Sequence, residues 1–411
     1  MSDQASFLKG ASDRYVAANA ATLRWMLARP GLHGPFLDTK VSSLTLTDYT
    51  NRDGLRGPDY TYGWIQGRGL EALASHAAFF ANQDAPLATA LDNRGRRLYD
   101  ALLALKRRDG HAYFCYDRAL QPIVADASGS VRHQDAAPTI FTYSDAFVAK
   151  GLIAGAVRYA PQDLPLHLDY FMQVIAAIES GRFQMDERCP LSEEAAAAQP
   201  DDFGPRMILL GAAGLLHRLG LSEHTNYADR FIAHVLEHHF EPSSGLLRNV
   251  PGDDACNVGH ALEFVGFAYD HTQEDGSSDL LARLETILIA SFDRGFVGPG
   301  LALAVSMTTG APLNPYCPWW SLPETIRAAS LCHARTGSDE ALRIWRDADE
   351  AFFQHYWRGA IAYQALTCDG PVDYVPATPD LDPGYHTGLS LLAAIGAANR
   401  TLTSLLPQAA G

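Results

Sequence analysis

The sequence predicts an all-α protein of the (α/α)6-barrel class, a toroid of six helical hairpins with short β-hairpins in its loops. Two observations support this prediction. Helices that are apolar on all sides, such as 207–216 and 389–398, alternate with helices that have a charged face, such as 339–355. The apolar helices are expected to begin near residues 63, 144, 204, 257, 320 and 384, which leaves room for two helices and their loops in each interval. Two concentric layers follow, in a single domain spanning residues 1–411.

The first half of the chain is expected to supply helices separated by two irregular passages. Residues 37–62 are polar and rich in glycine, and residues 193–205 are expected to form a loop despite their run of alanines. Residues 111–116 alternate in polarity and are followed by Gln121-Pro122, which predicts a short hairpin. The expected helices are 6–27, 63–80, 87–106, 144–157 and 164–180.

The second half of the chain is expected to be helical almost throughout. Its clearest helix start follows Pro251-Gly252, which breaks the chain, and Asn257, which offers a capping side chain. The expected helices are 205–219, 222–239, 257–270, 278–292, 319–336, 339–355 and 384–398, with a frayed tail after Thr401.

The composition is typical of a soluble globular protein, with 47% hydrophobic and 19% charged residues. Acidic residues outnumber basic residues by 47 to 32, which gives a formal net charge of −15. Because no basic patch is interleaved with aromatic residues, we expect neither a nucleic-acid partner nor an anionic membrane. The chain shows no basic-then-apolar leader at residues 1–9 and no run of about 18 apolar residues, so a cytoplasmic location is expected.

The six cysteines are scattered singly along the chain, with no C-x-x-C pair and no ligand cluster. This usage is typical of reduced thiols in a cytosolic protein. We therefore expect no structural zinc and no other metal or cofactor. The oligomeric state stays open, with a homodimer as a candidate.

His260 and Glu263 are the first candidate catalytic residues. A helix beginning near Asn257 places His260 in its first turn and Glu263 three residues later over the same face. The positive end of the helix dipole disfavours imidazolium there, and a neutral imidazole beside a carboxylate suits a general base. A lone histidine at such a place more often satisfies a buried polar contact, so the prediction depends on the rest of the chain.

Other polar residues fall at equivalent places in the remaining inner helices. The inner helices of a toroid run parallel, so that all their N-termini open onto one face. Arg68, Glu324 and His386 lie near the starts of three of these helices, and Trp319 and Trp320 precede Glu324. Each has a plain structural explanation, as a surface cation, a first-turn acid or a core aromatic. Together they predict one shared active site.

Five short segments, at residues 64–68, 143–147, 259–263, 319–324 and 385–386, carry the polar and aromatic residues near the expected helix starts. They resemble motifs of the N-acylglucosamine 2-epimerase family, in the family's order. They span residues 62 to 386 and therefore almost the whole chain. The family fold is an (α/α)6 barrel, in agreement with the helix spacing. The segments are Trp64-Ile-Gln-Gly-Arg68, similar to W-V-Q-G-R; Tyr143-Ser-Asp-Ala-Phe147, similar to Y-S-D-x-F; Gly259-His-Ala-Leu-Glu263, similar to G-H-x-x-E; Trp319-Trp320 with Glu324, similar to W-W-x-x-x-E; and Tyr385-His386, similar to a late F-H.

The resemblance implies proton transfer at the carbon next to a sugar aldehyde, with no redox cofactor. The reaction would be C2 epimerisation of a free aldose or N-acylhexosamine, or aldose–ketose isomerisation, on a monosaccharide or disaccharide. His260 and His386 would form the acid/base pair on opposite faces of the open-chain sugar, since imidazole exists in both protonation states near neutrality. Arg68 would stabilise the developing oxyanion. Glu263 and Glu324 would orient the histidines or bind sugar hydroxyls.

The resemblance also implies a set of substrate-binding residues and leaves the sugar open. Sugar isomerases and disaccharide epimerases of the family carry P-x-M-H-x-x-E on the third inner helix, where this chain has Ile208 for the histidine and Gly211 for the glutamate. The arginine of the late F-H-x-P-R motif is replaced by Leu389. The substrate-binding candidates are Trp64, Gln66, Tyr143, Asp145, Trp319 and Trp320.

Two other classes of function remain as alternatives. The first is a glycoside hydrolase or lyase of the same fold class, in which paired carboxylates from Asp145, Glu263 and Glu324 would do the chemistry. The second is a non-catalytic protein that binds a sugar or a protein partner. Cleavage of glycosidic bonds would indicate the first, and sugar affinity without exchange of the C2 proton would indicate the second.

Overall fold

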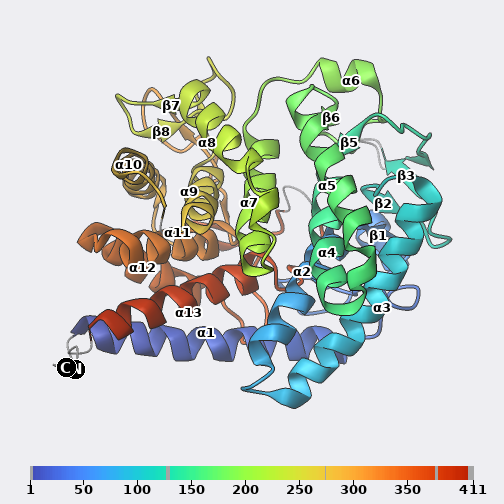
Figure 1. The fold of residues 1–411 in the computed structure, drawn as a ribbon, viewed down its shortest axis with the longest axis horizontal. Coiled ribbons are helices and arrows are strands. Elements are labelled where there is room, and N and C mark those ends of the chain that lie inside the picture. The colour runs from blue at the N-terminus through green and yellow to red at the C-terminus, as the bar shows by residue number, and fades with distance from the viewer. Residues whose placement is uncertain (1–2, 126–129, 274, 375–377, 406–411) are drawn as a thin grey trace. The chain divides into compact units, whose positions relative to one another are not determined.

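The structure is a computed structural model that describes residues 3–125, 130–273, 275–374 and 378–405. The fold is helical with short strands in the loops, which confirms the all-α class (Figure 1). The chain divides into two compact units, each described here by itself. Unit 1 comprises residues 1–22, 202–374 and 386–411, and unit 2 comprises residues 23–201 and 375–385. The expected single domain stays a prediction.

Unit 1 contains most of the helices of the second half of the chain. Helices α7, α9, α11 and α13 pack against one another in that order. Its helices are α7 (Gly204–Arg218), α8 (Tyr227–His238), α9 (Val258–Thr272), α10 (Ser278–Gly295), α11 (Ser321–Thr336), α12 (Asp339–Ala351), α13 (His386–Ser404), the short η3 (Ser222–His224), the π-helical turn η4 (Phe352–Tyr356), and the residues up to Thr22 of α1 (Asp3–Ala28).

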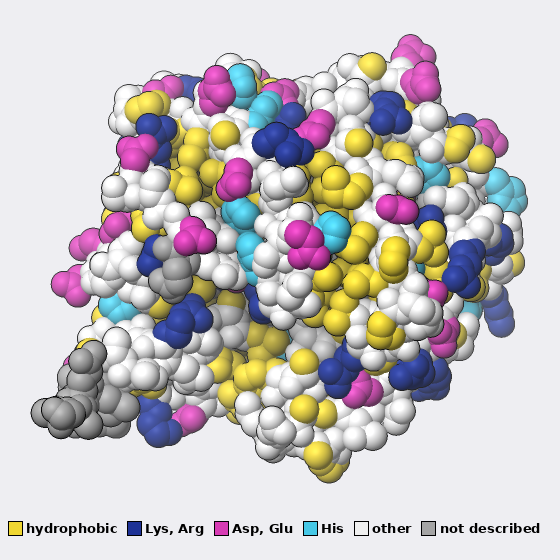
Figure 2. All heavy atoms as spheres, in the orientation of Figure 1, with side chains coloured by type: hydrophobic (Ala, Val, Ile, Leu, Met, Phe, Trp, Pro, Cys, Tyr) yellow, Lys and Arg dark blue, Asp and Glu magenta, His cyan; other side chains and the backbone are white. Residues whose placement is uncertain are grey.

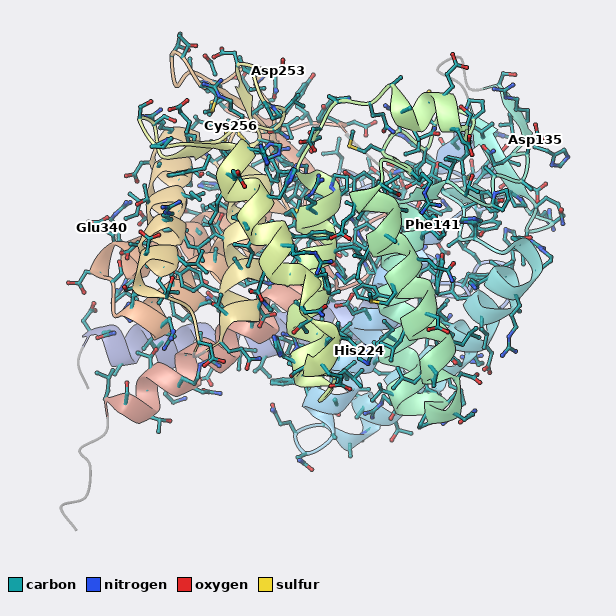
Figure 3. All side chains as sticks on the ribbon, turned by 45° about the horizontal axis from the view of Figure 1, so that its top comes forward. Asp135, Phe141, His224, Asp253, Cys256 and Glu340 are labelled. Atoms are coloured by element: carbon teal, nitrogen blue, oxygen red, sulfur yellow. The ribbon has the colours of Figure 1, made fainter. Side chains whose placement is uncertain are left out.

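The predicted alternation of apolar and amphipathic helices is present in unit 1. Residues 207–216 of α7 and 321–333 of α11 are buried without interruption. Helix α12, by contrast, carries a charged face. Glu340, which Figure 3 labels near the start of α12, has 58% of its side chain exposed. Helices that are apolar all round are therefore inside, as their sequence predicts.

Short antiparallel strand pairs connect the helices of unit 1. Strand β9, which pairs with β10 from a later part of the chain, immediately precedes α9, and β11 immediately precedes α11, so strands lie next to two of the inner helix starts. The strands are β7 (Phe240–Glu241), β8 (Leu246–Leu247), β9 (Ala255–Cys256), β10 (Val305–Ser306), β11 (Cys317–Pro318), β12 (Ala365–Thr367) and β13 (Gly370–Pro371).

Unit 2 is built around helices α2 and α4. Its helices are η1 (Asn51–Arg56), α2 (Gly63–Phe80), α3 (Ala85–Asp109), α4 (Tyr143–Tyr159), η2 (Pro161–Asp163), α5 (Leu164–Glu179) and α6 (Glu193–Ala197). Its strands are β1 (Thr61–Tyr62), β2 (Cys115–Tyr116), β3 (Pro122–Ala125), β4 (Val131–His133), β5 (Phe141–Thr142) and β6 (Phe183–Gln184).

Two glycines bring the backbones of α2 and α4 into direct contact. A Cβ atom on Gly67 would lie 2.6 Å from the backbone carbon of Phe147, and one on Gly151 would lie 2.5 Å from the carbonyl oxygen of Gly67. Larger side chains would therefore push the helices apart. The glycine of the Gln66-Gly67-Arg68 segment has this packing role, and it fixes where Arg68 lies relative to α4.

The helix starts agree closely with the sequence prediction, and the differences are local. The inner helices begin at residues 63, 143, 204, 258, 321 and 386. The predicted hairpin near residue 111 is confirmed, with Cys115 opposite Ile123, and it extends into the four-stranded sheet β1-β2-β3-β4.

Three expectations about irregular and helical segments were wrong in detail. Residues 193–205 are not only a loop, because Ser192 caps the short helix α6 through the backbone NH of Ala195. The expected helix 222–239 is broken between η3 and α8. The passage 37–62 contains the 3-10 helix η1, which Thr50 and Asp53 close in a capping box.

The surface is mixed in charge. On the face shown in Figure 2, acidic and basic side chains are interspersed among apolar ones. Among the described residues, none of the helices is both long enough and apolar enough to cross a membrane.

Candidate active site

Helix α9 begins as the sequence predicts and holds His260 in its first turn. The side-chain oxygen of Asn257 accepts a hydrogen bond from the backbone NH of His260 at 3.1 Å, so Asn257 is the helix cap. The backbone NH of Asn257 in turn donates to the side chain of Asn249 at 2.6 Å. His260 is half-buried, and its ring meets Phe203 edge-on at a centroid distance of 6.4 Å. The cap fixes the position of this histidine at the start of the helix.

His386 is the first residue of α13 and is buried against two carboxylates. Its Nδ1 lies 2.9 Å from Oε1 of Glu324 on α11 and 3.9 Å from Oε1 of Glu263 on α9. All three side chains are at least nine-tenths buried. The residues at positions 260, 263, 324 and 386 that the sequence predicts as catalytic therefore belong to one unit, and the structure joins three of them directly.

The charge of Glu324 is stabilised by its neighbours. Burial favours the protonated acid, but the guanidinium of Arg327 and the hydrogen bond from His386 outweigh it and hold the pKa of Glu324 below its usual value. A carboxylate only accepts hydrogen bonds, so Nδ1 of His386 is assigned as the protonated nitrogen. In the neutral ring, Nε2 then carries the lone pair. This is the tautomer that a general base on Nε2 requires.

The ring of Trp320 lies close to both histidines. Its centroid is 5.3 Å from that of His260 and 5.8 Å from that of His386, with interplanar angles of 34° and 38°. Trp319 meets His386 edge-on at 6.2 Å. A Cβ atom on Gly259 would lie 2.6 Å from the Trp320 ring, so the glycine before His260 makes this close approach possible. The Gly259-His260 segment therefore packs directly against the Trp319-Trp320 segment.

Unit 2 contains the second group of predicted residues, centred on Arg68. The guanidinium carbon of Arg68 lies 4.0 Å from the ring centroid of Phe147, 5.1 Å from that of Trp64 and 5.4 Å from that of Tyr385. Stacking on aromatic faces is a role that guanidinium fills better than ammonium. Lys150 donates a hydrogen bond to the hydroxyl of Tyr385.

Three predicted substrate-binding residues of unit 2 have contacts within the fold. Gln66 is fully buried and exchanges two hydrogen bonds with the backbone of Leu37, at 2.7 and 3.0 Å. Asp145 is 1% exposed and closes a capping box with Thr142 at the start of α4. Tyr143 packs edge-on against Phe183. Their predicted role in substrate binding stays a prediction, while their visible role is structural.

Sequence reasoning missed the residues that support the two groups. Arg327, 5% exposed, lies 3.3 Å from Oε2 of Glu324. Lys150 and Glu71 form a buried ion pair of 3.4 Å in unit 2. A lysine and an arginine inside otherwise apolar helices are the sequence signal that could have found them, because a buried charge needs a partner.

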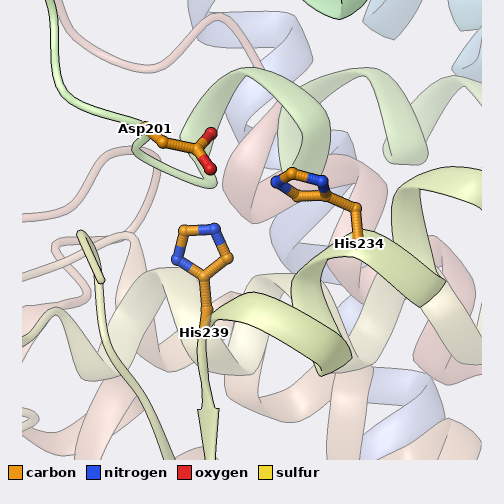
Figure 4. A group of neighbouring side chains, drawn as sticks. All are labelled: Asp201, His234 and His239. Atoms are coloured by element: carbon orange, nitrogen blue, oxygen red, sulfur yellow. The ribbon is translucent and has the colours of Figure 1, made fainter. Parts of the chain in front are cut away.

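One set of side chains within unit 1 has donor atoms that a metal ion could use. Glu263, Glu324 and His386 place one donor each within 4.8 Å of one another, but Arg327 already neutralises Glu324, which disfavours a cation there. The sequence also contains an H-x-x-x-H pattern that was overlooked, formed by His234 and His238 one turn apart on α8. The His234 ring centroid lies 4.5 Å from that of His238. It lies 5.7 Å from the ring centroid of His239, and Figure 4 shows these two side chains.

The comparison with known proteins gives similarity of structure only. No described protein family and no curated protein sequence matches the chain. A cellobiose 2-epimerase from Spirochaeta thermophila superimposes with a TM-score of 0.71 at 12% identity, over 98% of this chain and 100% of that chain. A D-mannose isomerase gives a TM-score of 0.64 at 12% identity, over 98% of this chain and 100% of that one.

An enzyme of different chemistry has the same fold. The GH76A α-1,6-mannanase from Salegentibacter sp. superimposes with a TM-score of 0.53 at 9% identity, over 92% of this chain and 98% of that one. At these identities the likeness establishes the fold and does not by itself choose between the reactions. The chain therefore has the (α/α)6 fold that solved sugar epimerases, a sugar isomerase and a mannanase share.

Proposed function

We propose that this protein is a sugar epimerase or isomerase that moves a proton at C2 of a free aldose or N-acylhexosamine. The hydrogen bond between His386 and Glu324 is the observation that carries the proposal, because it prepares Nε2 of His386 as a base. The fold shared with solved sugar epimerases and a mannose isomerase supports the substrate class. The motif resemblance over residues 62 to 386 supports the same reaction.

The proposed reaction needs two groups that exchange protons and no change of oxidation state overall. In one direction, Nε2 of His386 removes the proton from C2 of the open-chain sugar. The C–H electron pair forms the C1–C2 double bond, and the carbonyl electrons move to O1, which gives an enediolate. His260 returns a proton to the opposite face of C2, which yields the epimer and restores the C1 carbonyl.

The same enediolate can also lead to a ketose. If the proton returns to C1 while the C2 hydroxyl passes its proton to O1, the electrons left on O2 form the C2 carbonyl and the product is the ketose isomer of the aldose. The carboxylate of Glu324 stabilises the imidazolium that forms on His386 in either case. The choice between epimerisation and isomerisation depends on which carbon faces the returning proton.

Arg68 is assigned to oxyanion stabilisation on the basis of the motif resemblance. Its guanidinium keeps a permanent charge, and it lies against three aromatic rings in unit 2, which limit its movement. Preorganised charge of this kind is the usual means of stabilising an enediolate oxygen.

Proton NMR in D2O tests the proposal directly. The purified protein is incubated with N-acetylglucosamine, N-acetylmannosamine, glucose, mannose, fructose and cellobiose, each in a separate tube. Loss of the C2 proton signal together with a new epimer or ketose is the expected result. A panel with no exchange in any sugar would contradict the proposal for these substrates.

The glycoside hydrolase alternative is supported by the mannanase likeness alone. Glu324 is fully buried, ionised and bonded to both Arg327 and His386, which does not suit a general acid for a leaving group. Incubation with α-1,6-mannan separates the alternatives, since release of reducing ends without exchange at C2 would favour the hydrolase.

A further inference from the structure

Charged and polar side chains from several helices lie around His386. Helix α9 contributes Glu263, and α11 contributes Glu324 with Arg327 behind it. From α1, the neutral Asn19 donates to the carbonyl of Gly388 on α13 at 3.1 Å. His260 lies against the Trp320 ring, with 5.3 Å between the ring centroids. Arg327 is a permanent cation within this group of described residues.

Arg327 is held in place by an aromatic ring as well as by Glu324. Its guanidinium carbon lies 4.8 Å from the ring centroid of Phe267 on α9, and Nη1 lies 3.3 Å from Oε2 of Glu324. Gly266 makes room for the side chain, because a Cβ atom there would lie 3.2 Å from Cδ of Arg327. The cation–π contact and the ion pair together hold the buried guanidinium of Arg327 in one position.

The Phe267 ring in turn depends on Gly211 of α7. A Cβ atom on Gly211 would lie 2.7 Å from Cζ of Phe267 and within 3.0 Å of two neighbouring ring atoms. Any larger side chain at position 211 would displace the ring. A continuous set of contacts therefore runs through four inner helices, from Gly211 on α7 to Phe267 on α9, Arg327 and Glu324 on α11, and His386 on α13.

We infer that Arg327 is a positioning residue of the proposed active site, which acts through Glu324 to keep Nε2 of His386 free of its proton. Phe267 and Gly211 support it. The inference rests on the proposed function for its catalytic meaning. Its physical content, the proton affinity of His386, is independent of any sugar.

The charge balance explains the effect. The negative charge of Glu324 beside the imidazole favours imidazolium, because an opposite charge within a few ångströms stabilises the protonated ring. Arg327 offsets that charge. Without Arg327, the charge of Glu324 would act on His386 uncompensated, so Nε2 would keep its proton to a higher pH.

The test is NMR titration of protein labelled with 15N in histidine, with the His386 signal identified by its absence in His386→Gln. In Arg327→Met the titration midpoint of this signal should move upward by about one pH unit or more, the effect of a nearby charge. Deuterium exchange into the sugar should show the same upward move of its acidic limb, with kcat lowered at pH 6 and KM little changed. An unchanged midpoint would overturn the inference.

Two further variants separate charge from structure. Arg327→Lys keeps the charge and should restore most of the wild-type midpoint. Arg335→Met removes the same charge from the same helix, two turns or about 12 Å further along, and should leave the midpoint unchanged. A midpoint that moves equally in Arg335→Met would show a general charge effect and would overturn the inference.

If Arg327→Met does not fold, Phe267→Leu provides a second test of the same inference. It removes the aromatic face under the guanidinium and should move the midpoint in the same direction by a smaller amount. The two proposals fail separately. A wild-type protein without exchange activity contradicts the proposed function, whereas normal exchange with an unmoved midpoint in the Arg327 and Phe267 variants contradicts only the inference.

Discussion

His386 and Glu324 are 62 residues apart in the sequence and are joined by a hydrogen bond of 2.9 Å between Nδ1 and Oε1. Each lies in the first turns of an inner helix, and α11 and α13 pack directly against each other. The bond fixes the tautomer of the histidine. The fold brings the two helix starts together, and the hydrogen bond between them leaves Nε2 as the basic nitrogen that the proposed chemistry needs.

Removal of either histidine is expected to abolish turnover. His386→Ala and His260→Ala should each reduce the rate of deuterium exchange at C2 by at least 100-fold, the lower range for general acid–base catalysis. Circular dichroism and thermal unfolding should show folded proteins. The matched control is His224→Ala, a partly exposed residue of η3, which should keep wild-type rates. Substantial exchange in either catalytic variant would refute the two-histidine mechanism.

Glu324→Gln is expected to weaken the base while keeping its geometry. The amide oxygen can still accept the hydrogen bond from Nδ1 of His386, but the negative charge is lost. Imidazolium then loses its stabilising partner, so the acidic limb of the kcat/KM profile should move to lower pH and kcat should fall by about 10- to 100-fold. Deuterium exchange measured from pH 5 to 9 checks both. A limb that moves upward would show that Glu324 does not stabilise imidazolium.

Arg68→Lys is expected to reduce kcat although the charge is kept. Ammonium lacks the planar face that lies against Phe147, Trp64 and Tyr385, and it lacks the fork of donors. Initial rates on the sugar that exchanges in the wild type measure the effect, with Arg97→Lys on the exposed face of α3 as control. Wild-type kcat in Arg68→Lys would assign Arg68 to structure alone.

Gly259→Ala is expected to disturb the Trp320 ring, which lies close to both histidines. The new Cβ would lie 2.6 Å from Trp320, so the indole must move or α9 must shift. We expect a lower melting temperature, changed tryptophan fluorescence and reduced exchange. Gly252→Ala is not an equivalent control, because Gly252 has a φ of 90°. Ala261→Gly, in the same turn, removes bulk instead and should leave the fluorescence maximum unchanged.

The helix starts could be predicted because their signals are local. Pro251-Gly252 and Asn257 are the sequence signal for the start of α9. Ser192 followed by two glutamates is the signal for the start of α6, in a segment that was expected to be a loop. The capping box of Thr142 and Asp145 is also legible as T-x-x-D. Such a pattern favours a structural role for Asp145, which the motif resemblance alone did not suggest.

The support of the candidate site could not be predicted, because it depends on contacts between helices. Gly211 replaces the glutamate of a family motif, and the space beside it is filled by the ring of Phe267, on the next inner helix. Arg327 lies one turn after Glu324, which the sequence shows, yet its burial over Phe267 follows only from the packing of α9 on α11. The periodicity of side chains predicts which face of a helix is buried, but it does not predict which other helix packs against that face.

Glu187 gives a prediction about stability that is independent of catalysis. It is buried beside the start of α4, where Oε1 and Oε2 accept hydrogen bonds from the backbone NH and the hydroxyl of Ser144, at 3.1 and 2.7 Å. Burial, together with the negative charge of Asp145, raises the pKa of Glu187 to about 8. The folded protein therefore keeps this proton at pH values where an unfolded chain has released it.

The sign of the pH dependence follows from that difference. Between the ordinary pKa of a glutamate, about 4.3, and the raised value, the unfolded state binds fewer protons than the folded state, so this group makes stability fall as pH rises. Glu187→Gln resembles the protonated acid and should remove this contribution. Urea unfolding should therefore give similar stability for wild type and variant at pH 5, and a more stable variant at pH 8. A variant that is destabilised equally at both values would show that Glu187 is ionised in the folded protein.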